Sequence, residues 1–213
     1  KALLERGVRL HLSDGDGFLA EHYQSNLENI LSAAMVAKYK LNAPFAGALA
    51  SDPEIGMQKL RPGHILRDTT ATETPINTWL SNSIAAGAFV AGADYFIGFG
   101  TSNDEAANID KEACVLLLGA EFTQGGSPVV EELLLQVGNI TYPVIVLRDA
   151  WAADNRNRRR AVRFHPILLE PKATVLGQVY SIAVSTTQEL RLLGVTFGLG
   201  RFLRKQTYTA VSL

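Results

Sequence analysis

Apolar residues recur at intervals of three and four along one segment near the start of the chain. Between Phe18 and Tyr39 they follow a helical spacing, and polar residues fill the opposite face. Asp14 and Asp16 precede the segment and two lysines close it, so the charges at both ends complement a helix dipole. The pattern predicts an amphipathic helix. Its apolar positions are Leu19, Tyr23, Leu27, Ile30, Leu31 and Ala34, its polar ones Glu21, Gln24, Ser25, Glu28, Asn29 and Ser32, and its closing lysines Lys38 and Lys40.

The next stretch, Leu41 to Pro62, has no sustained period. Prolines and glycines interrupt it too often for a long helix or strand. We expect an irregular arm that either links the helix to the following domain or lies across a neighbouring subunit.

Beyond residue 63 the pattern changes to short apolar runs bounded by turn residues, which is typical of strands. Gly138 and Asn139 separate two such runs and predict a hairpin. About eight strands in 150 residues predict a mainly β fold, an antiparallel β-sandwich or a barrel. We expect residues 1–62 to hold the helix and arm and residues 63–213 the sandwich. The strands are expected at His64–Thr70, Ala88–Phe99, Ala113–Thr123, Glu131–Val137, Thr141–Arg148, Ala161–Leu169, Thr174–Ser185 and Glu189–Phe197, with Arg201–Val211 as a candidate ninth.

Composition places the chain in the globular class. Of its 213 residues 47% are hydrophobic and only 19% are charged, which hints at surface buried between subunits. The lone cysteine, Cys114, excludes an internal disulfide, and its apolar neighbours predict a buried side chain. The most apolar stretch, residues 84–93, is about half the length that a membrane span needs. The charged start lacks the apolar core of a signal peptide, although earlier residues could have been removed.

The charge is divided unevenly along the chain. Residues 1–150 hold 10 basic and 18 acidic residues, a net −8, whereas residues 151–213 hold 10 basic and 3 acidic, a net +7. Such a division favours head-to-tail contact between copies, unless folding interleaves the two parts.

Catalytic and metal-binding patterns are missing. The histidines are scattered without the paired spacing that a metal site uses. The chain has neither a Gly-x-Ser-x-Gly nucleophile elbow nor a phosphate loop with its lysine. Glu131 and Glu132 are adjacent, so in a strand they would face opposite ways, unlike the facing carboxylates of a glycosidase. We therefore expect no enzyme activity, no catalytic residues, no metal and no cofactor.

The strongest local signal is basic: five arginines crowd eight positions before an expected strand. They attract phosphate by charge alone, and no aromatic residue among them offers base stacking. Three interpretations remain: non-specific contact with a nucleic-acid backbone, salt bridges to an acidic patch on a neighbour, or a solvated loop. The arginines are Arg156, Arg158, Arg159, Arg160 and Arg163.

One stretch, Val162 to Leu203, resembles known proteins. It runs through Phe164-His165-Pro166 to Glu170-Pro171-Lys172, then a long alternating strand, a polar turn, and Leu-Arg-Leu-Leu-Gly194-Val-Thr-Phe-Gly198. This order resembles the closing strands of viral jelly-roll proteins, the capsid and decoration subunits of icosahedral viruses and tailed phages. The resemblance implies a sandwich that tiles a shell and transfers no catalytic residue.

The expected function is therefore a structural subunit of a viral, phage-like particle that assembles through its sandwich and N-terminal arm. Its partners would be copies of itself and other virion proteins, with non-specific nucleic-acid contact at the arginines, and its location the virion. The alternative is a β-sandwich module, cytoplasmic in location, that binds carbohydrate or protein. A third hypothesis, an enzyme with a dispersed site, has no motif behind it.

Overall fold

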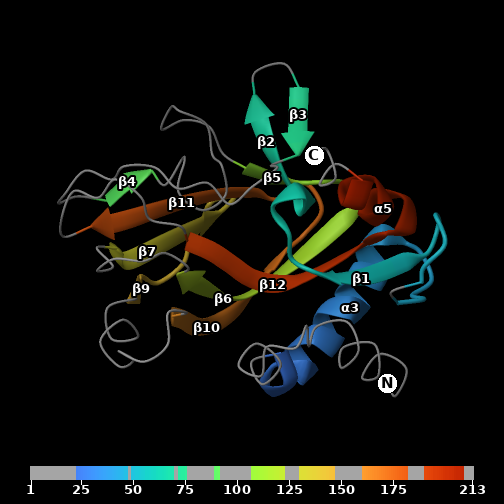
Figure 1. Cartoon of the computed structure of the whole chain (residues 1–213), viewed down its shortest axis with the longest axis horizontal. Coiled ribbons are helices and arrows are strands. Elements are labelled where there is room, and N and C mark those ends of the chain that lie inside the picture. The colour runs from blue at the N-terminus through green and yellow to red at the C-terminus, as the bar shows by residue number, and fades with distance from the viewer. Residues whose placement is uncertain are drawn as a thin grey trace.

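The computed structural model describes residues 23–47, 49–69, 72–75, 89–91, 107–122, 130–146, 160–181 and 190–208 (Figure 1). Within these ranges twelve strands and two α-helices form, with one short 3₁₀ turn. In chain order they are α3 Leu27–Leu41, β1 Ile55–Lys59, η1 Pro62–His64, β2 Ile65–Thr69, β3 Thr72–Pro75, β4 Phe89–Ala91, β5 Ala107–Ile109, β6 Ala113–Phe122, β7 Val130–Val137, β8 Ile140–Thr141, β9 Ile145–Val146, β10 Arg160–Leu169, β11 Thr174–Ser181, β12 Leu190–Leu199 and α5 Gly200–Tyr208.

The described strands form two antiparallel sheets. Sheet A has the order β1-β12-β6-β10, and sheet B has the order β3-β2-β5-β11-β7-β8, with β4 also on β11 and β9 also on β7. The pairs are nested: β1 with β12, β4 and β5 with β11, β6 with β10, and β7 with β8 and β9. Nested antiparallel pairs folded into two sheets are the arrangement of a jelly roll. The expected β-sandwich is confirmed, with more strands than the eight anticipated.

Strand β6 lies inside sheet A, between β12 and β10, and both of its faces are buried. Val115 and Leu117 face the core between the sheets, while Cys114 and Leu116 face outward from sheet A. An apolar run without alternation is the sequence pattern of such a strand. The core between the sheets consists of Leu60, Ile65, Ile109, Ala113, Val115, Leu117, Ala120, Leu133, Leu135, Ile167, Leu169, Val175, Leu192, Phe202 and Leu203.

Helix α3 covers the outer face of sheet A. Ile30, Ala34 and Ala37 are buried against the outward side chains of β1, β6 and β12, whereas the polar positions from Gln24 to Ser32 that were assigned to the opposite face are exposed. The helix ends at Asn42, which adopts a left-handed conformation with φ of 48°. The predicted amphipathic helix is confirmed over the described residues; positions 14–22 lie outside them.

The expectation of an irregular arm from 41 to 62 is wrong for residues 55–59. These form β1, which pairs with β12 in register from Ile55–Leu199 to Lys59–Val195. Ile55 and Met57 complete the surface that α3 covers. The sandwich therefore takes strands from both sides of residue 62. A five-residue strand between prolines has too little pattern of its own, and β12 supplies the missing stabilisation.

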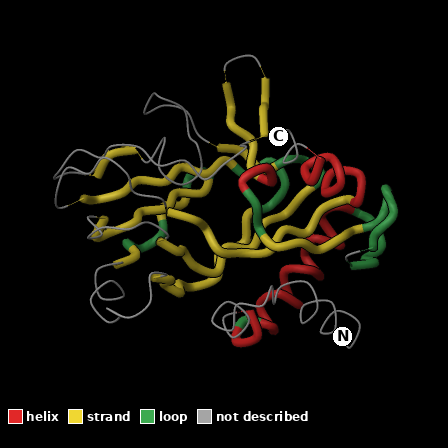
Figure 2. The backbone as a smooth tube through the Cα atoms, viewed as in Figure 1, coloured by secondary structure: helices red, strands yellow, loops and turns green. Residues whose placement is uncertain are grey.

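The candidate strand at 201–211 is also wrong for residues 201–208, and residues 209–211 lie outside the described residues. Residues 200–208 form helix α5, which lies beside β1 at one end of the molecule (Figure 2). The adjacent residues Phe202 and Leu203 are both buried, and this is compatible with a helix but not with a strand, where neighbours face opposite ways. The charged residues around them face solvent.

The hairpin at Gly138 and Asn139 is confirmed. Val137 pairs with Ile140 across it, and Gly138 has a φ of +56°, which suits glycine. The strand expected next is interrupted at residues 142–144, where Pro143 has no N–H to donate, and its described part divides into β8 and β9. A proline and an irregularity on an edge strand discourage another chain from pairing there.

Candidate functional site

The outward face of α3 carries large apolar side chains. Met35 and Tyr39 lie one turn apart on this face and are 73% and 83% exposed, while the opposite face packs on sheet A. A helix that already buries one face needs only polar residues on the other. Met35 and Tyr39 therefore form an exposed pair of large side chains on the outward face of the helix.

A hollow of about 520 Å³ adjoins Met35. Leu31, Ala34 and Met35 line it from α3, and Phe45 lines it from the chain that leaves the helix. Charged side chains flank it at Glu28 and Lys38, which are about 15 Å apart along the helix axis. An apolar trough with a charge of each sign suits an amphipathic peptide segment or a partner's side chains, and Ser32 completes the lining.

The platform beneath the hollow is fixed from both ends. Near the start, the Tyr23 hydroxyl donates a hydrogen bond of 3.2 Å to the Gly194 carbonyl on β12. Near the end, Lys40 pairs with Glu170 at 2.7 Å, and this hydrogen bond raises the pKa of Lys40 above its ordinary value. Phe45 packs on Phe197 with ring centroids 6.4 Å apart. These contacts hold the helix and the hollow in one arrangement.

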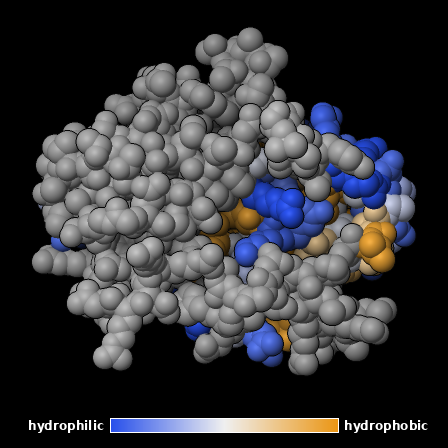
Figure 3. Space-filling model, viewed as in Figure 1, coloured by the Kyte–Doolittle hydropathy of each residue, from blue (hydrophilic) through white to orange (hydrophobic). Residues whose placement is uncertain are grey.

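The loop between α3 and β1 adds a further exposed apolar residue. Leu49 in this loop is 96% exposed. Figure 3 shows an apolar (orange) patch at the right edge of the view, over this loop, beside strongly polar surface. The described residues of the chain's first third thus present apolar side chains from both the helix and the loop that follows it.

Only part of the arginine cluster lies within the described residues. Arg156, Arg158 and Arg159 lie outside them, and Arg160 begins β10, where its backbone pairs with Phe122. Arg163 is exposed and donates a hydrogen bond of 3.5 Å to the Ser25 hydroxyl. The structure therefore brings one of the five arginines to the start of the helical region.

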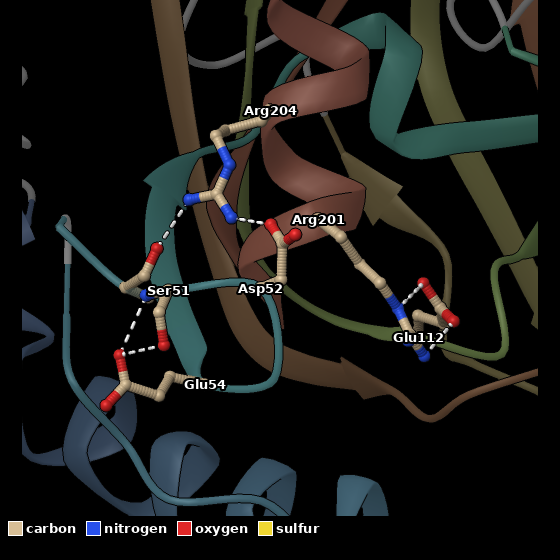
Figure 4. Close-up of polar contacts among 7 residues, drawn as sticks. Ser51, Asp52, Glu54, Glu112, Arg201 and Arg204 are labelled. Carbon is tan, nitrogen blue, oxygen red and sulfur yellow. Dashed lines mark hydrogen bonds and ion pairs between the residues drawn. The ribbon is translucent and has the colours of Figure 1, made fainter.

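Two ion pairs attach helix α5 to the rest of the chain (Figure 4). Arg201 donates to both carboxylate oxygens of Glu112, at 3.1 and 2.5 Å, and this pairing raises the pKa of Arg201. Arg204 pairs with Asp52 and donates 2.6 Å to the Ala50 carbonyl. Both ion pairs join the exposed side of α5 to segments that are far away in the sequence.

The loop that receives Arg204 has its own hydrogen bonds. Ser51 donates from its backbone N–H and its hydroxyl to the same Glu54 oxygen, at 2.7 and 2.6 Å (Figure 4). These bonds favour the ionised carboxylate and lower the pKa of Glu54. The loop is thereby preformed around the end of α5.

A buried histidine is the titratable group that the sequence pattern does not reveal. His64 is fully buried, and burial, with the nearby Arg61 charge, lowers the pKa of its imidazole to about 3. The apolar residues that follow it, Ile65 and Leu66, were the only available signal. Cys114 is also buried, as predicted, and burial raises the pKa of its thiol to about 12.

The described residues contain no group of three or more histidine, cysteine or acidic side chains placed to hold a metal ion. No helix among them is long and apolar enough to cross a membrane. The chemistry that these residues do offer is apolar contact at α3 and ion pairing at α5.

Comparison with known proteins gives no family for this chain. No protein-family model matches it, and no curated protein does either. Among solved structures it is similar to a rhamnosidase from Klebsiella oxytoca with rhamnose bound, at 13% identity and a TM-score of 0.24. The match covers 81% of this chain and 32% of that one, so this chain spans about a third of the enzyme. A likeness this weak transfers neither fold nor activity.

Proposed function

We propose that this chain is a structural subunit of a viral, phage-like particle and that it assembles with copies of itself. The observation that supports the proposal is the outward face of α3, where Met35 and Tyr39 are exposed and Met35 lines an apolar hollow. The jelly-roll sandwich is compatible with this role and with many others, because one fold serves many functions. The proposal therefore rests on the outward face of α3 and not on the fold.

The strength of such a contact suits a shell. Burying a side chain of the size of methionine or tyrosine contributes about 1.5–3 kcal/mol, so the pair contributes about 3–6 kcal/mol before the entropy of association. Association costs about 4 kcal/mol or more in lost translational and rotational freedom, so the pair by itself gives a contact too weak for a stable dimer. Closed symmetric assemblies repeat a weak contact many times, so each one can stay weak.

The proposal is tested with a double variant, Met35→Ser together with Tyr39→Ser. Sedimentation velocity and electron micrographs of the wild-type chain should show assemblies, and those of the double variant should show mostly monomer. Val146→Ser is the matched control, since Val146 is 51% exposed but lies on β9. It should assemble as the wild type does.

Two results would count against the proposal. A wild-type chain that stays strictly monomeric at high concentration has no self-assembly to explain. Selective, saturable binding on a glycan array by such a monomer would instead support the alternative, a β-sandwich module that binds carbohydrate.

A further inference from the structure

His64 lies where the turn η1 meets helix α5. Its ring centroid is 6.1 Å from that of Phe202 on α5, and the residue has no exposed surface. The backbone N–H of Arg61 donates a hydrogen bond of 3.2 Å to its Nδ1. Because Nδ1 accepts, the proton of the neutral ring must sit on Nε2. Nε2 is buried with no hydrogen-bond partner among the described residues.

Protonation of the His64 ring in this arrangement lowers the stability of the closed state. The free lone pair of the ring is at Nδ1, so protonation there breaks the bond with the Arg61 N–H. It also places a positive charge in a fully buried site beside the ring of Phe202. Neutral His64 is part of the core, and charged His64 must leave it.

The surrounding charges offer the cation little compensation. Among the described residues, α5 and β3 both pack on η1. Helix α5 brings three cations, and the sequence of β3 contains one acidic residue; Arg201 is paired with Glu112 and Arg204 with Asp52. Another cation precedes the turn. In order, these charged residues are Arg201, Arg204, Lys205, Glu73 and Arg61.

Helix α5 is the element that can yield. It has nine residues, far fewer than a helix needs to be stable alone, so its stability depends on the surface on which it packs. Two glycines in that surface leave room for its buried side chains, since a Cβ at Gly198 would lie 2.9 Å from Phe202 and one at Gly56 would lie 2.7 Å from Leu203. Short elements at the end of a fold open before central strands do.

We propose that His64 and α5 form an acid-operated latch, in which protonation of His64 releases α5 from the end of the sandwich while the central strands stay folded. The latch is a property of one chain and does not depend on the proposed assembly. Its release exposes Phe202, Leu203 and the core surface that they cover.

The direction of the pH effect follows from the burial of His64. Its pKa is about 3 in the closed state and 6.5 when exposed, so the closed state is stabilised above pH 6.5 and loses that stabilisation as the pH falls. The opening equilibrium rises about tenfold for each pH unit between these values. From pH 7.5 to 4.5 the open population of α5 should increase on the order of 100-fold.

Hydrogen exchange measured by mass spectrometry tests the latch, with rates corrected for the intrinsic effect of pH. Peptides from α5 should lose on the order of 100-fold in protection between pH 7.5 and 4.5, while peptides from β6 keep theirs. His64→Asn retains an acceptor for the Arg61 N–H without a titrating group, and it should abolish the response. His165→Asn is the control, since His165 is exposed on β10.

The latch is overturned if α5 protection does not change with pH, if β6 loses protection by the same factor, or if His64→Asn responds as the wild type does. Should His64→Asn fail to fold, an NMR titration of the wild-type imidazole replaces it. His64 must then titrate together with the α5 amide signals. Titration of His64 without any change in α5 would likewise overturn the proposal.

Discussion

Gly194 on β12 links sheet A to the helical region through a hydrogen bond. Its carbonyl accepts a hydrogen bond from the Tyr23 hydroxyl and another, of 2.9 Å, from the Leu60 N–H. It sits where the β6–β12 register shifts: Gly194 pairs with Leu117 and the preceding Leu193 with Gly119. The shift leaves one residue of β6 unpaired and turns the strand, so the helix can reach the sheet backbone.

Gly194 should therefore not tolerate a side chain. A Cβ there would press on the backbone of Leu116, which cannot move aside as a side chain can. We expect Gly194→Ala to lower the free energy of unfolding by about 3 kcal/mol, measured by urea denaturation. Gly138→Asn is the control, because its Cβ meets nothing within 4 Å and asparagine tolerates the positive φ. Equal losses in both variants would contradict this account.

The thiol of Cys114 should be unreactive in the folded chain. It is buried between β6 and α3, and its thiol has a raised pKa, so little thiolate exists at neutral pH. We expect no reaction with a thiol reagent in buffer and one equivalent in denaturant. Rapid labelling of the native protein would show that α3 lifts from sheet A.

At the scale of elements, α3 has two faces with different roles. Ile30 is fully buried against sheet A and Met35 is exposed. Ile30→Ala should lower the free energy of unfolding by about 2–5 kcal/mol, because it leaves a cavity. Met35→Ala should change it by less than about 0.5 kcal/mol. Thermal or chemical denaturation of the monomer measures both, and a reversed order would mean that the helix packs by its other face.

Elements β1 and α5 show why some elements escape prediction. Each is short, and each gains its conformation from a partner far away in the sequence: β1 from β12, and α5 from the glycines beneath it and the carboxylates at its rim. Local pattern is weak there, so the tertiary contacts decide the conformation. In α3 and β6, by contrast, ten or more residues repeat one pattern.

At the scale of the whole molecule, the uneven charge of the sequence is partly neutralised within one chain. The described ion pairs Arg201–Glu112, Arg204–Asp52 and Lys40–Glu170 each join residues 1–150 to residues 151–213. The two parts interleave, so the charge division along the sequence is not a division in space. Head-to-tail attraction between copies therefore has less support than the sequence suggested.

A role for the arginine cluster in assembly or in nucleic-acid contact remains a prediction. Replacing Arg158, Arg159 and Arg160 with serine should weaken retention of nucleic acid or assembly. For nucleic acid, the slope of log affinity against log salt should fall by up to about three. Lys111→Ser is the control, since Lys111 is exposed on another part of the chain. Unchanged retention and unchanged assembly would remove the role.

The candidate site was only half predictable. The period of α3 fixed which residues face sheet A, and its remaining face follows from that. Nothing in the sequence placed Phe45 beside Leu31 to form the hollow, since Phe45 is held there by Phe197 on β12. Nor did it distinguish His64 from a solvated histidine, because burial of a single polar residue depends on what packs over it.

The sequence by itself determined the amphipathic helix, most of the long strands and the buried Cys114, because each rests on a repeated local pattern. Only the tertiary structure decided the strand order, the conformations of β1 and α5, and the burial of His64, since these depend on contacts between segments far apart in the sequence. Hydrophobic periodicity specifies which face of an element is buried. Which element packs on that face depends on shape complementarity and hydrogen bonding in the folded chain.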